Sequence, residues 1–382
     1  MQRATSAISA LLLISAVGVL AIVSSASATT SARVVSTDRF APPPGFTTVV
    51  PVQGAGSTGV MTVDLVVNGV FQAALLDTRS HTYTMLVPGA PGSHAIGITP
   101  DGQTVAYSVH EHIGYSTTSH VFVRNLSTGV TEQVDLDPTG APLDTMCTGV
   151  GPSSLTPDGR FVAFTCAASR PYVRDLQSGR LTAAPDTVHA ASGYALLDNG
   201  NLLFASPGTA TGPDFSNAIG GYVYSWTPTT GAVAPVVDCG TAACAFGGAS
   251  GDGHLLAYVT TAATVDTAHV RDLPTNARWT SQLSQRGWAA SVAHDASAVV
   301  VREGTDGVHP IATFIGDPDH GFTSLNSAMG APAGQLATWI DDDARTIWSM
   351  SDRDAAAWHL ALTHDDPPTI TVSITATANP AP

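Results

Sequence analysis

Lysine is absent from this chain of 382 residues, and glutamate occurs only as Glu111, Glu132 and Glu303. Charge is sparse, at 12% of residues, and unbalanced, with 15 basic against 30 acidic side chains. The formal net charge of -15 opposes binding to the phosphate backbone of nucleic acids and to anionic lipid surfaces. We therefore exclude nucleic acid as a partner.

The sequence also lacks the short motifs that mark several enzyme classes. It contains no His-Glu-x-x-His zinc motif, no glycine-rich phosphate loop and no Gly-x-Ser-x-Gly elbow. The nearest approach to that elbow, at 247–251, has Ser250 one place too late. Catalysis by side chains assembled across loops stays open, and we expect no cofactor.

Long hydrophobic runs are missing except near the N-terminus. An apolar stretch from Ile8 to Val23 follows Arg3 and precedes three small residues at 26–28. This order is typical of a signal peptide that is cleaved near Ala28. The serine and glycine residues within the stretch disfavour the alternative, a membrane anchor. We expect a secreted, extracellular protein without membrane insertion once residues 1–28 are removed.

Cysteine is scarce, and its even number in an exported chain favours disulfides over metal binding. The register of the intervening hairpin places Cys147 nearly opposite Cys166, close enough for a bridge. Cys239 and Cys244 enclose four residues, and a disulfide between them would close a short local loop. A Cys-x4-Cys metal half-site is the alternative, but it lacks a second pair at a matching spacing.

Turn motifs, in contrast, recur at intervals of about forty residues. The clearest copies are Thr99-Pro100-Asp101-Gly102-Gln103 and Thr156-Pro157-Asp158-Gly159-Arg160, each followed by a short apolar run. With weaker copies included, the last turn residues are Gly59, Gly102, Gly159, Gly200, Gly253, Ala296 and Gly334. Proline presets a negative φ and glycine tolerates a positive one, so each motif closes a hairpin.

A second corner follows each of these hairpins. Examples are Asn125-Leu126-Ser127-Thr128-Gly129 and Asp175-Leu176-Gln177-Ser178-Gly179. The apolar runs between corners are continuous, as expected for strands that are buried between two neighbouring sheets. Two hairpins in each period predict a four-stranded antiparallel blade.

These paired corners resemble the TolB-like, or WD40-like, β-propeller repeat, whose blades carry a Ser-Pro-Asp-Gly turn and an Asp-Leu-x-x-Gly turn. The resemblance covers roughly residues 57–362. It implies an all-β fold, a single β-propeller of six to eight four-stranded antiparallel blades, and our count of the repeats is seven. It also implies a non-enzymatic protein that presents its loops to another protein or to a cell-envelope polymer.

We expect the propeller to span residues 45–375 and to be monomeric. A flexible N-terminal segment at 29–44 would precede it, and a flexible tail at 376–382 would follow. Ring closure is expected from a strand at 369–374, which has only the first blade left to pair with.

The longer connections are expected on one face of the ring, opposite the short corners and together with both disulfides. Loops on a rigid scaffold commonly carry function, although tolerated insertions are the alternative reading. The candidate binding residues on these connections are His110, Glu111, His112, Tyr115, Asp214, Phe215 and Asn217.

Metal and catalytic chemistry have weak support. His110 and His112 alternate along a strand and would share one face, but a third ligand is not identifiable, and we expect no metal. Asp135-Leu136-Asp137 resembles the opening of a calcium loop without its later glutamate. A lyase or hydrolase with a site over the central channel is the alternative to a binding scaffold, because the fold does not decide between them.

Overall fold

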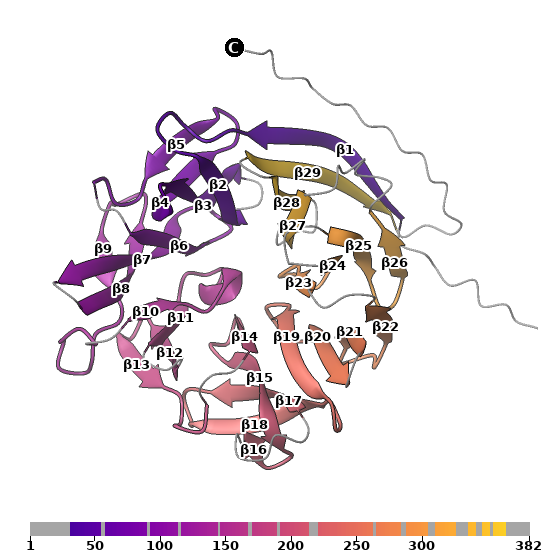
Figure 1. The fold of residues 1–382 in the computed structure, drawn as a ribbon. Helices are drawn as coiled ribbons and strands as arrows, with labels where there is room; N and C mark the ends of the chain where they lie inside the picture. Colours follow the sequence, from indigo (N-terminus) through magenta and orange to yellow (C-terminus); the bar gives the residue numbers. More distant parts are fainter. Residues whose placement is uncertain are drawn as a thin grey trace, which may run out of the picture.

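The computed structural model describes residues 31–363, except 55–57, 90–91, 114–115, 144–145, 167–169, 189–191, 214–220, 263–264, 284–287, 305–309, 326–334, 341–345 and 352–353. These residues form seven antiparallel sheets. Figure 1 shows the sheets arranged as a ring, with consecutive sheets side by side. The chain is therefore an all-β, seven-bladed propeller, which confirms the predicted fold class.

Blades 1 to 6 take their strands in chain order, from the innermost outwards. Blade 1 contains β2 (Thr48–Gly54), β3 (Val60–Val67), β4 (Val70–Asp77) and β5 (Thr82–Met85). Blade 2 contains β6 (Ser93–Ile98), β7 (Thr104–Ile113), β8 (Ser116–Asn125) and β9 (Thr131–Gln133). Blade 3 contains β10 (Cys147–Gly149), β11 (Phe161–Cys166), β12 (Arg170–Asp175) and β13 (Arg180–Ala183), with the 3-10 turn η2 (Pro152–Ser154) after β10.

The remaining blades follow the same order. Blade 4 contains β14 (Ser192–Leu196), β15 (Leu202–Thr209), β17 (Gly221–Thr227) and β18 (Ala232–Asp238), with β16 (Gly212–Pro213) paired to the end of β15. Blade 5 contains β19 (Ala243–Ala249), β20 (Leu255–Ala262), β21 (Val265–Asp272) and β22 (Arg278–Leu283). Blade 6 contains β23 (Trp288–Val292), β24 (Val299–Gly304), β25 (Pro310–Asp317) and β26 (Gly321–Ser324).

Blade 7 closes the ring with both ends of the described chain. Its inner strands are β27 (Gln335–Ile340), β28 (Thr346–Ser351) and β29 (Asp354–Thr363), and its outermost strand is β1 (Ser31–Phe40). Figure 1 shows β1 lying along the outside of β29, and the antiparallel pairing runs from Ser31 opposite Thr363 to Phe40 opposite Ala355.

This closure corrects the sequence-based expectation for the N-terminal segment. Residues 29–44 were expected to be flexible, yet β1 occupies most of that range and supplies the closing strand. The strand expected at 369–374 lies outside the described residues, as do the predicted signal peptide and tail. Within the described ranges, no helix has the length and apolar character needed to cross a membrane.

The repeated first corners share one hydrogen-bond arrangement. The Thr99 hydroxyl donates to Asp101 Oδ1 at 2.6 Å and accepts the Thr104 amide at 3.0 Å. The corners that begin at Thr156 and Ser250 repeat both bonds. The second corners are held by a side chain that accepts following amides, as Asp175 accepts those of Gln177 and Ser178. Both arrangements are local side-chain turns, which explains why they recur with the motif.

The apolar core lies between neighbouring blades. Between blades 2 and 3, for example, Ile96 and Val121 pack in one cluster with Val162 and Phe164. Such strands are covered on both sides, and the apolar runs are accordingly continuous rather than alternating. Each fully buried side chain of this size contributes roughly 1.5–3 kcal/mol, so the packing between blades stabilises the ring.

Candidate functional site

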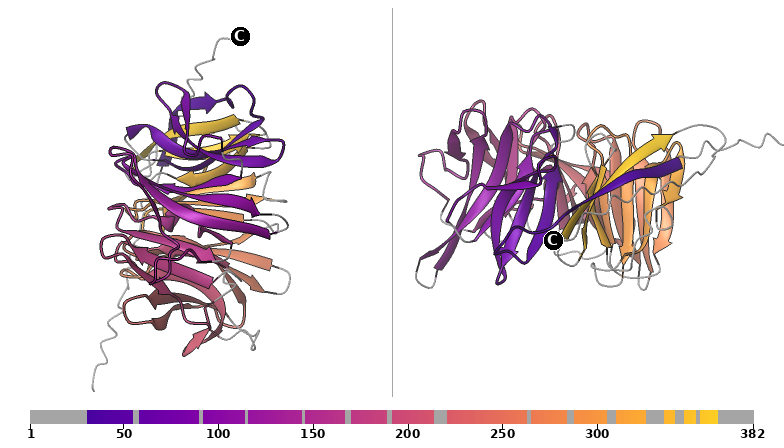
Figure 2. Two further views of the ribbon diagram at one scale, coloured as in Figure 1. Left: turned by 90° about the vertical axis from the view of Figure 1, so that its left-hand side faces the viewer. Right: turned by 90° about the horizontal axis from the view of Figure 1, so that it is seen from above.

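Strand order assigns each connection to one of two faces of the ring. The first turn of a blade, such as 99–103, and its third turn, such as 126–130, lie at the same strand ends and form what we call the short-turn face. Connections such as 134–146 and 239–242, which join successive blades, emerge at the opposite strand ends and form the loop-rich face. Figure 2 shows the ring edge-on, with strand ends on its two sides.

Both predicted disulfides are present, and both lie on the loop-rich face. Cys147, the first residue of β10, is bonded to Cys166, the last residue of β11, and the two are paired across the strands. Cys239 and Cys244 span the connection from β18 to β19. One bridge thus ties two strands of blade 3, and the other ties the connection from blade 4 to blade 5.

A pocket of about 340 Å³ opens on this face where blades 1, 2 and 3 meet; we call it the blade 1–3 pocket. It is lined by Val52 and Asp64 of blade 1, by His94, Ala95, Ile96, His110 and Ser119 of blade 2, and by Met146, Thr148, Gly149 and Gly151 of blade 3 or its approach. His94 is the second residue of β6, His110 comes late in β7 and Met146 directly precedes β10, which places all three near the loop-rich ends of these strands.

The floor of the pocket contains a carboxylate and an imidazole from different blades. Asp64 Oδ2 lies 2.9 Å from His94 Nδ1, and Asp64 Oδ1 accepts the Ala95 amide at 2.7 Å. The Asp64 side chain is 9% exposed and that of His94 is 33% exposed. A buried carboxylate needs such partners, and here they also join blade 1 to the innermost strand of blade 2.

Two further rings surround His94. The Phe71 ring lies 4.6 Å from that of His94, and the His110 ring meets His94 edge-on at 5.1 Å, both between centroids. Backbone bonds hold this arrangement, because the Gly92 amide donates to Phe71 O and the His110 amide donates to Gly92 O. Gly92 has a φ of 84°, and a Cβ there would lie 3.3 Å from His110 Cβ. Glycine is thus required where the chain passes between the two blades.

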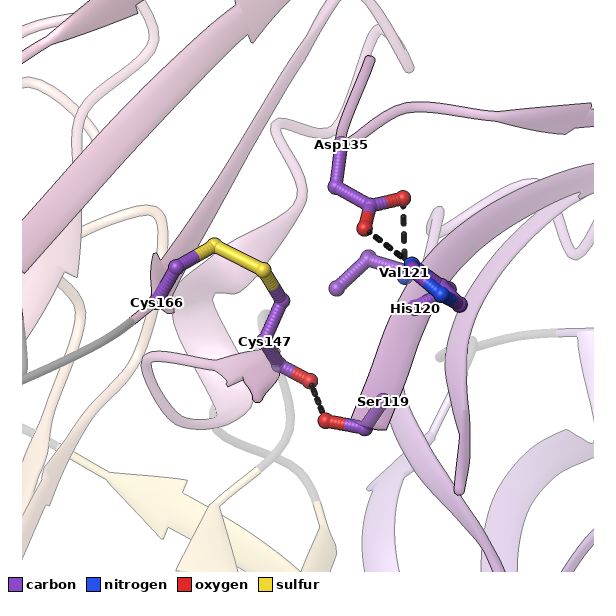
Figure 3. The surroundings of a disulfide bond; sticks show 6 residues. All are labelled: Ser119, His120, Val121, Asp135, Cys147 and Cys166. Atoms are coloured by element: carbon purple, nitrogen blue, oxygen red, sulfur yellow. Dashed lines mark hydrogen bonds and ion pairs between the residues drawn. A yellow bond between two sulfur atoms is a disulfide. The ribbon is translucent and has the colours of Figure 1, made fainter. Parts of the chain in front are cut away.

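Met146 forms the exposed rim of the pocket. It is 53% exposed, although it directly precedes the buried, disulfide-bonded Cys147. The Ser119 hydroxyl donates to Cys147 O at 2.5 Å, as Figure 3 shows, so the disulfide and β8 fix the chain at this point. Methionine is frequent at adaptable binding surfaces, and here its exposed thioether borders a pocket.

A second pair of an imidazole and a carboxylate joins β8 of blade 2 to the connection that leads to blade 3. His120 Nδ1 lies 2.7 Å from the fully buried Asp135 Oδ2, and Asp135 Oδ1 accepts the Val121 amide (Figure 3). Asp137 accepts the hydroxyl of Thr139 and the Ala141 amide, and these bonds lower the pKa of Asp137. The residues that resemble a calcium loop thus stabilise their own turn and the neighbouring strand.

The central channel contains a separate, smaller cavity of about 210 Å³. Three of its polar side chains are engaged in contacts between blades. Gln53 Oε1 accepts the Ile98 amide, Ser291 Oγ accepts the Ile340 amide, and His294 Nε2 lies 2.9 Å from Asp198 Oδ1. Much of the remaining lining is glycine and alanine, so these side chains chiefly hold the inner strands together.

The structure places only part of the predicted site. His110 lines the blade 1–3 pocket, and Glu111 is exposed beside it. The backbone of His112 continues β7, while the structure does not describe its side chain. The predicted residues outside the described ranges are Tyr115, Asp214, Phe215 and Asn217. Among the residues that are described, no three metal-ligating side chains converge.

Sequence reasoning missed Asp64, His94 and Met146. Asp64 carried a usable signal, because it is the sole charge within the apolar run of β3, and a charge in a buried strand needs a partner. His94 and Met146 carried no comparable signal. Their importance follows from contacts between residues 30 positions apart in sequence and from the placement of three blades.

No protein-family model and no curated protein matches the sequence. Among solved structures, the chain is similar to an oligogalacturonate lyase in complex with manganese, with a TM-score of 0.56, 13% identity, and coverage of 87% of this chain and 98% of that one. It is similar to the oligogalacturonate lyase of Vibrio parahaemolyticus, with a TM-score of 0.55, 12% identity, and coverage of 86% and 98%. The match to TolB of Acinetobacter baumannii has a TM-score of 0.45 and 17% identity, and it covers 73% of this chain but only 63% of TolB.

At these identities the likeness concerns the fold alone. The fold is the β-propeller that the TolB-like corners of the sequence predicted.

Proposed function

We propose that this protein is an exported, non-enzymatic propeller that binds another protein through its loop-rich face, with the blade 1–3 pocket as the anchoring point. The observation that carries the proposal is the pocket itself, with Asp64 and His94 in its floor and the exposed Met146 on its rim. Aromatic and methionine side chains are enriched in protein interfaces. Two intramolecular disulfides are compatible with action outside the cytosol.

The size of the pocket favours a protein over an envelope polymer. Pockets for small ligands range from about 300 to 1,000 Å³, and the blade 1–3 pocket, at about 340 Å³, is at the lower end. It accommodates one side chain or one ring rather than several units of a polymer. A protein partner would insert one such side chain and bury the surrounding loops around it.

The channel supports catalysis less well than the loop-rich face supports binding. Its cavity of about 210 Å³ lies below the usual range for ligand pockets. Gln53, Ser291 and His294 already have structural partners there. A channel enzyme would have to release these groups before they could act on a substrate.

Site-directed photo-crosslinking tests the proposal. A photoreactive phenylalanine replaces Met146 in one variant and Val130 in the other, which is 64% exposed on the short-turn face of blade 2. Both variants are exposed to the secreted and envelope fractions of the producing cells. We expect a discrete protein adduct at position 146 that excess unmodified protein suppresses, and none at position 130. Equal labelling at both positions would contradict the proposal.

A further inference from the structure

The blade 1–3 pocket combines apolar walls with the imidazoles of His94 and His110. Val52, Ile96 and Met146 supply aliphatic or thioether surface, and the Phe71 ring backs the imidazole of His94. Asp64 is the acid of the pocket, and its two oxygens already bind His94 and the Ala95 amide. A ligand therefore meets mainly apolar surface together with the imidazoles of His94, which is one-third exposed, and His110.

The carboxylate determines which hydrogen-bond role the outer edge of the His94 imidazole plays. A carboxylate accepts hydrogen bonds, so the contact with Asp64 Oδ2 assigns the proton to His94 Nδ1. In neutral imidazole the other nitrogen, Nε2, is then an acceptor. Among the described residues no hydrogen bond to His94 Nε2 is present, and the side chain is one-third exposed. The pocket thus offers an acceptor whose direction the protein fixes in advance.

We infer that the pocket binds an aromatic ring that carries a single hydrogen-bond donor, namely the phenol of a tyrosine or the indole of a tryptophan on the partner protein. This inference rests on the proposed function and names the chemistry of the anchoring side chain. The ring packs between Met146 and the aliphatic wall, and its O–H or N–H donates to His94 Nε2. Both ring types require a polar partner when buried, and thioether sulfur packs favourably at ring edges.

Other side chains fit the pocket less well. An acidic side chain would approach the Asp64 carboxylate in a chain whose formal net charge is -15. A basic side chain finds both oxygens of Asp64 engaged and the group 9% exposed. A phenylalanine ring would pack against the apolar walls. It would, however, remove water from the His94 Nε2 acceptor without supplying a hydrogen-bond donor.

Imidazole NMR with small probes tests the inference on the oxidised protein. The probes are N-acetyl-tyrosinamide, N-acetyl-tryptophanamide and N-acetyl-phenylalaninamide, titrated at about pH 8, where free imidazole is neutral. We expect the first two to shift the His94 Nε2 resonance saturably and the phenylalanine probe to bind about tenfold more weakly, because it lacks the donor. Equal affinity of all three probes, or no saturable shift, would overturn the inference.

Two variants separate the roles of the imidazole and the rim. His94→Phe keeps a ring against Phe71 and removes the acceptor, so the tyrosine and phenylalanine probes should then bind equally. Met146→Ala changes an exposed residue and should weaken all three probes by a similar factor, about threefold to tenfold. His254→Phe, at an exposed corner of blade 5, is the matched control and should bind as wild type does.

The outcomes also distinguish this inference from the proposed function. Crosslinking at position 146 without any preference for the tyrosine or tryptophan probes refutes the aromatic anchor and leaves the binding face intact. Probe binding at His94 without a protein adduct at position 146 refutes the protein-binding role. In that case the free phenol or indole compound, rather than a side chain, is the ligand.

Discussion

The short-turn face and the loop-rich face of the ring are built by different kinds of contact. On the short-turn face, Thr99, Thr156 and Ser250 each hold a corner through bonds to residues two and five positions away. On the loop-rich face, Cys147 is tied to Cys166 and Asp64 to His94, over 19 and 30 positions. The first face repeats from blade to blade, whereas the second differs between blades.

The difference shows where a propeller of this kind can vary. Local hydrogen bonds specify each corner independently, so the short-turn face has a similar structure from one blade to the next. Contacts between distant residues fix the loops individually, and each junction between blades can hold a different arrangement. The pocket at blades 1 to 3 is one such arrangement, on the face that the repeat leaves unconstrained.

Removing the Cys147–Cys166 bond should have the largest effect on stability. The double change to alanine frees a segment with a sequence separation of 19, and we expect the free energy of unfolding to fall by about 3 kcal/mol. Urea denaturation of the oxidised proteins measures this. The matched change at Cys239 and Cys244, with a separation of 5, should cost less, about 2 kcal/mol. A larger loss for the shorter bridge would contradict the chain-entropy account.

Breaking one of the hydroxyl-held corners of the short-turn face should have a smaller effect, similar for the corners that begin at Thr99 and Thr156. Thr156→Val keeps the shape of a side chain that is 1% exposed but removes its bonds to Asp158 and the Phe161 amide. We expect a loss of about 1–2 kcal/mol in urea denaturation. Thr99→Val should match it, because its hydrogen bonds are the same.

The exposed Thr84→Val on β5 serves as the control for these corner variants and should stay within about 0.5 kcal/mol of wild type. If Thr156→Val unfolds like Thr84→Val, the hydroxyl does not hold the corner.

The smallest effect is a pH dependence in the body of blade 5, away from both faces. Burial and the nearby Arg278 lower the pKa of His269, whose ring stacks on Tyr258 at 4.8 Å. Below the ordinary histidine pKa of about 6.5, the unfolded chain therefore holds more protons than the folded one. This contribution to stability is present above that pH and is lost as the pH falls towards the folded-state pKa.

His269→Phe keeps the stacked ring and removes the titration. Denaturation between pH 5 and 8, within the range in which histidine titrates, should show a flatter stability curve for this variant than for wild type. The exposed His254→Gln should leave the slope unchanged. An unaltered slope in His269→Phe would show that other groups cause the pH dependence.

Much of the fold was predictable because its determinants are local. The corners at Thr99 and Thr156 contain their own hydrogen-bonding groups, and the apolar runs after them specify strands that are covered on both sides. The closing strand was not predictable in this way, since β1 matches no repeat. Its place is set by pairing with β29, more than 300 residues away in the chain.

The site was predictable only in part. Cysteine register and spacing located both disulfides, and the predicted residue His110 lines the blade 1–3 pocket. Asp64 and His94 were missed, because one ion pair between two blades creates their role. No pattern within either strand alone specifies which residue of the next blade it will meet.

The central claim is that a partner protein binds the loop-rich face at the blade 1–3 pocket. Amide hydrogen exchange tests this claim most directly, because one experiment measures protection on both faces of the ring. The oxidised protein is compared alone and with the partner that crosslinks at position 146. The account predicts slower exchange at 92–96 and 146–149 around the blade 1–3 pocket, and no change at the corners 99–103 and 156–160. Equal protection of both faces, or protection confined to those corners, would contradict it.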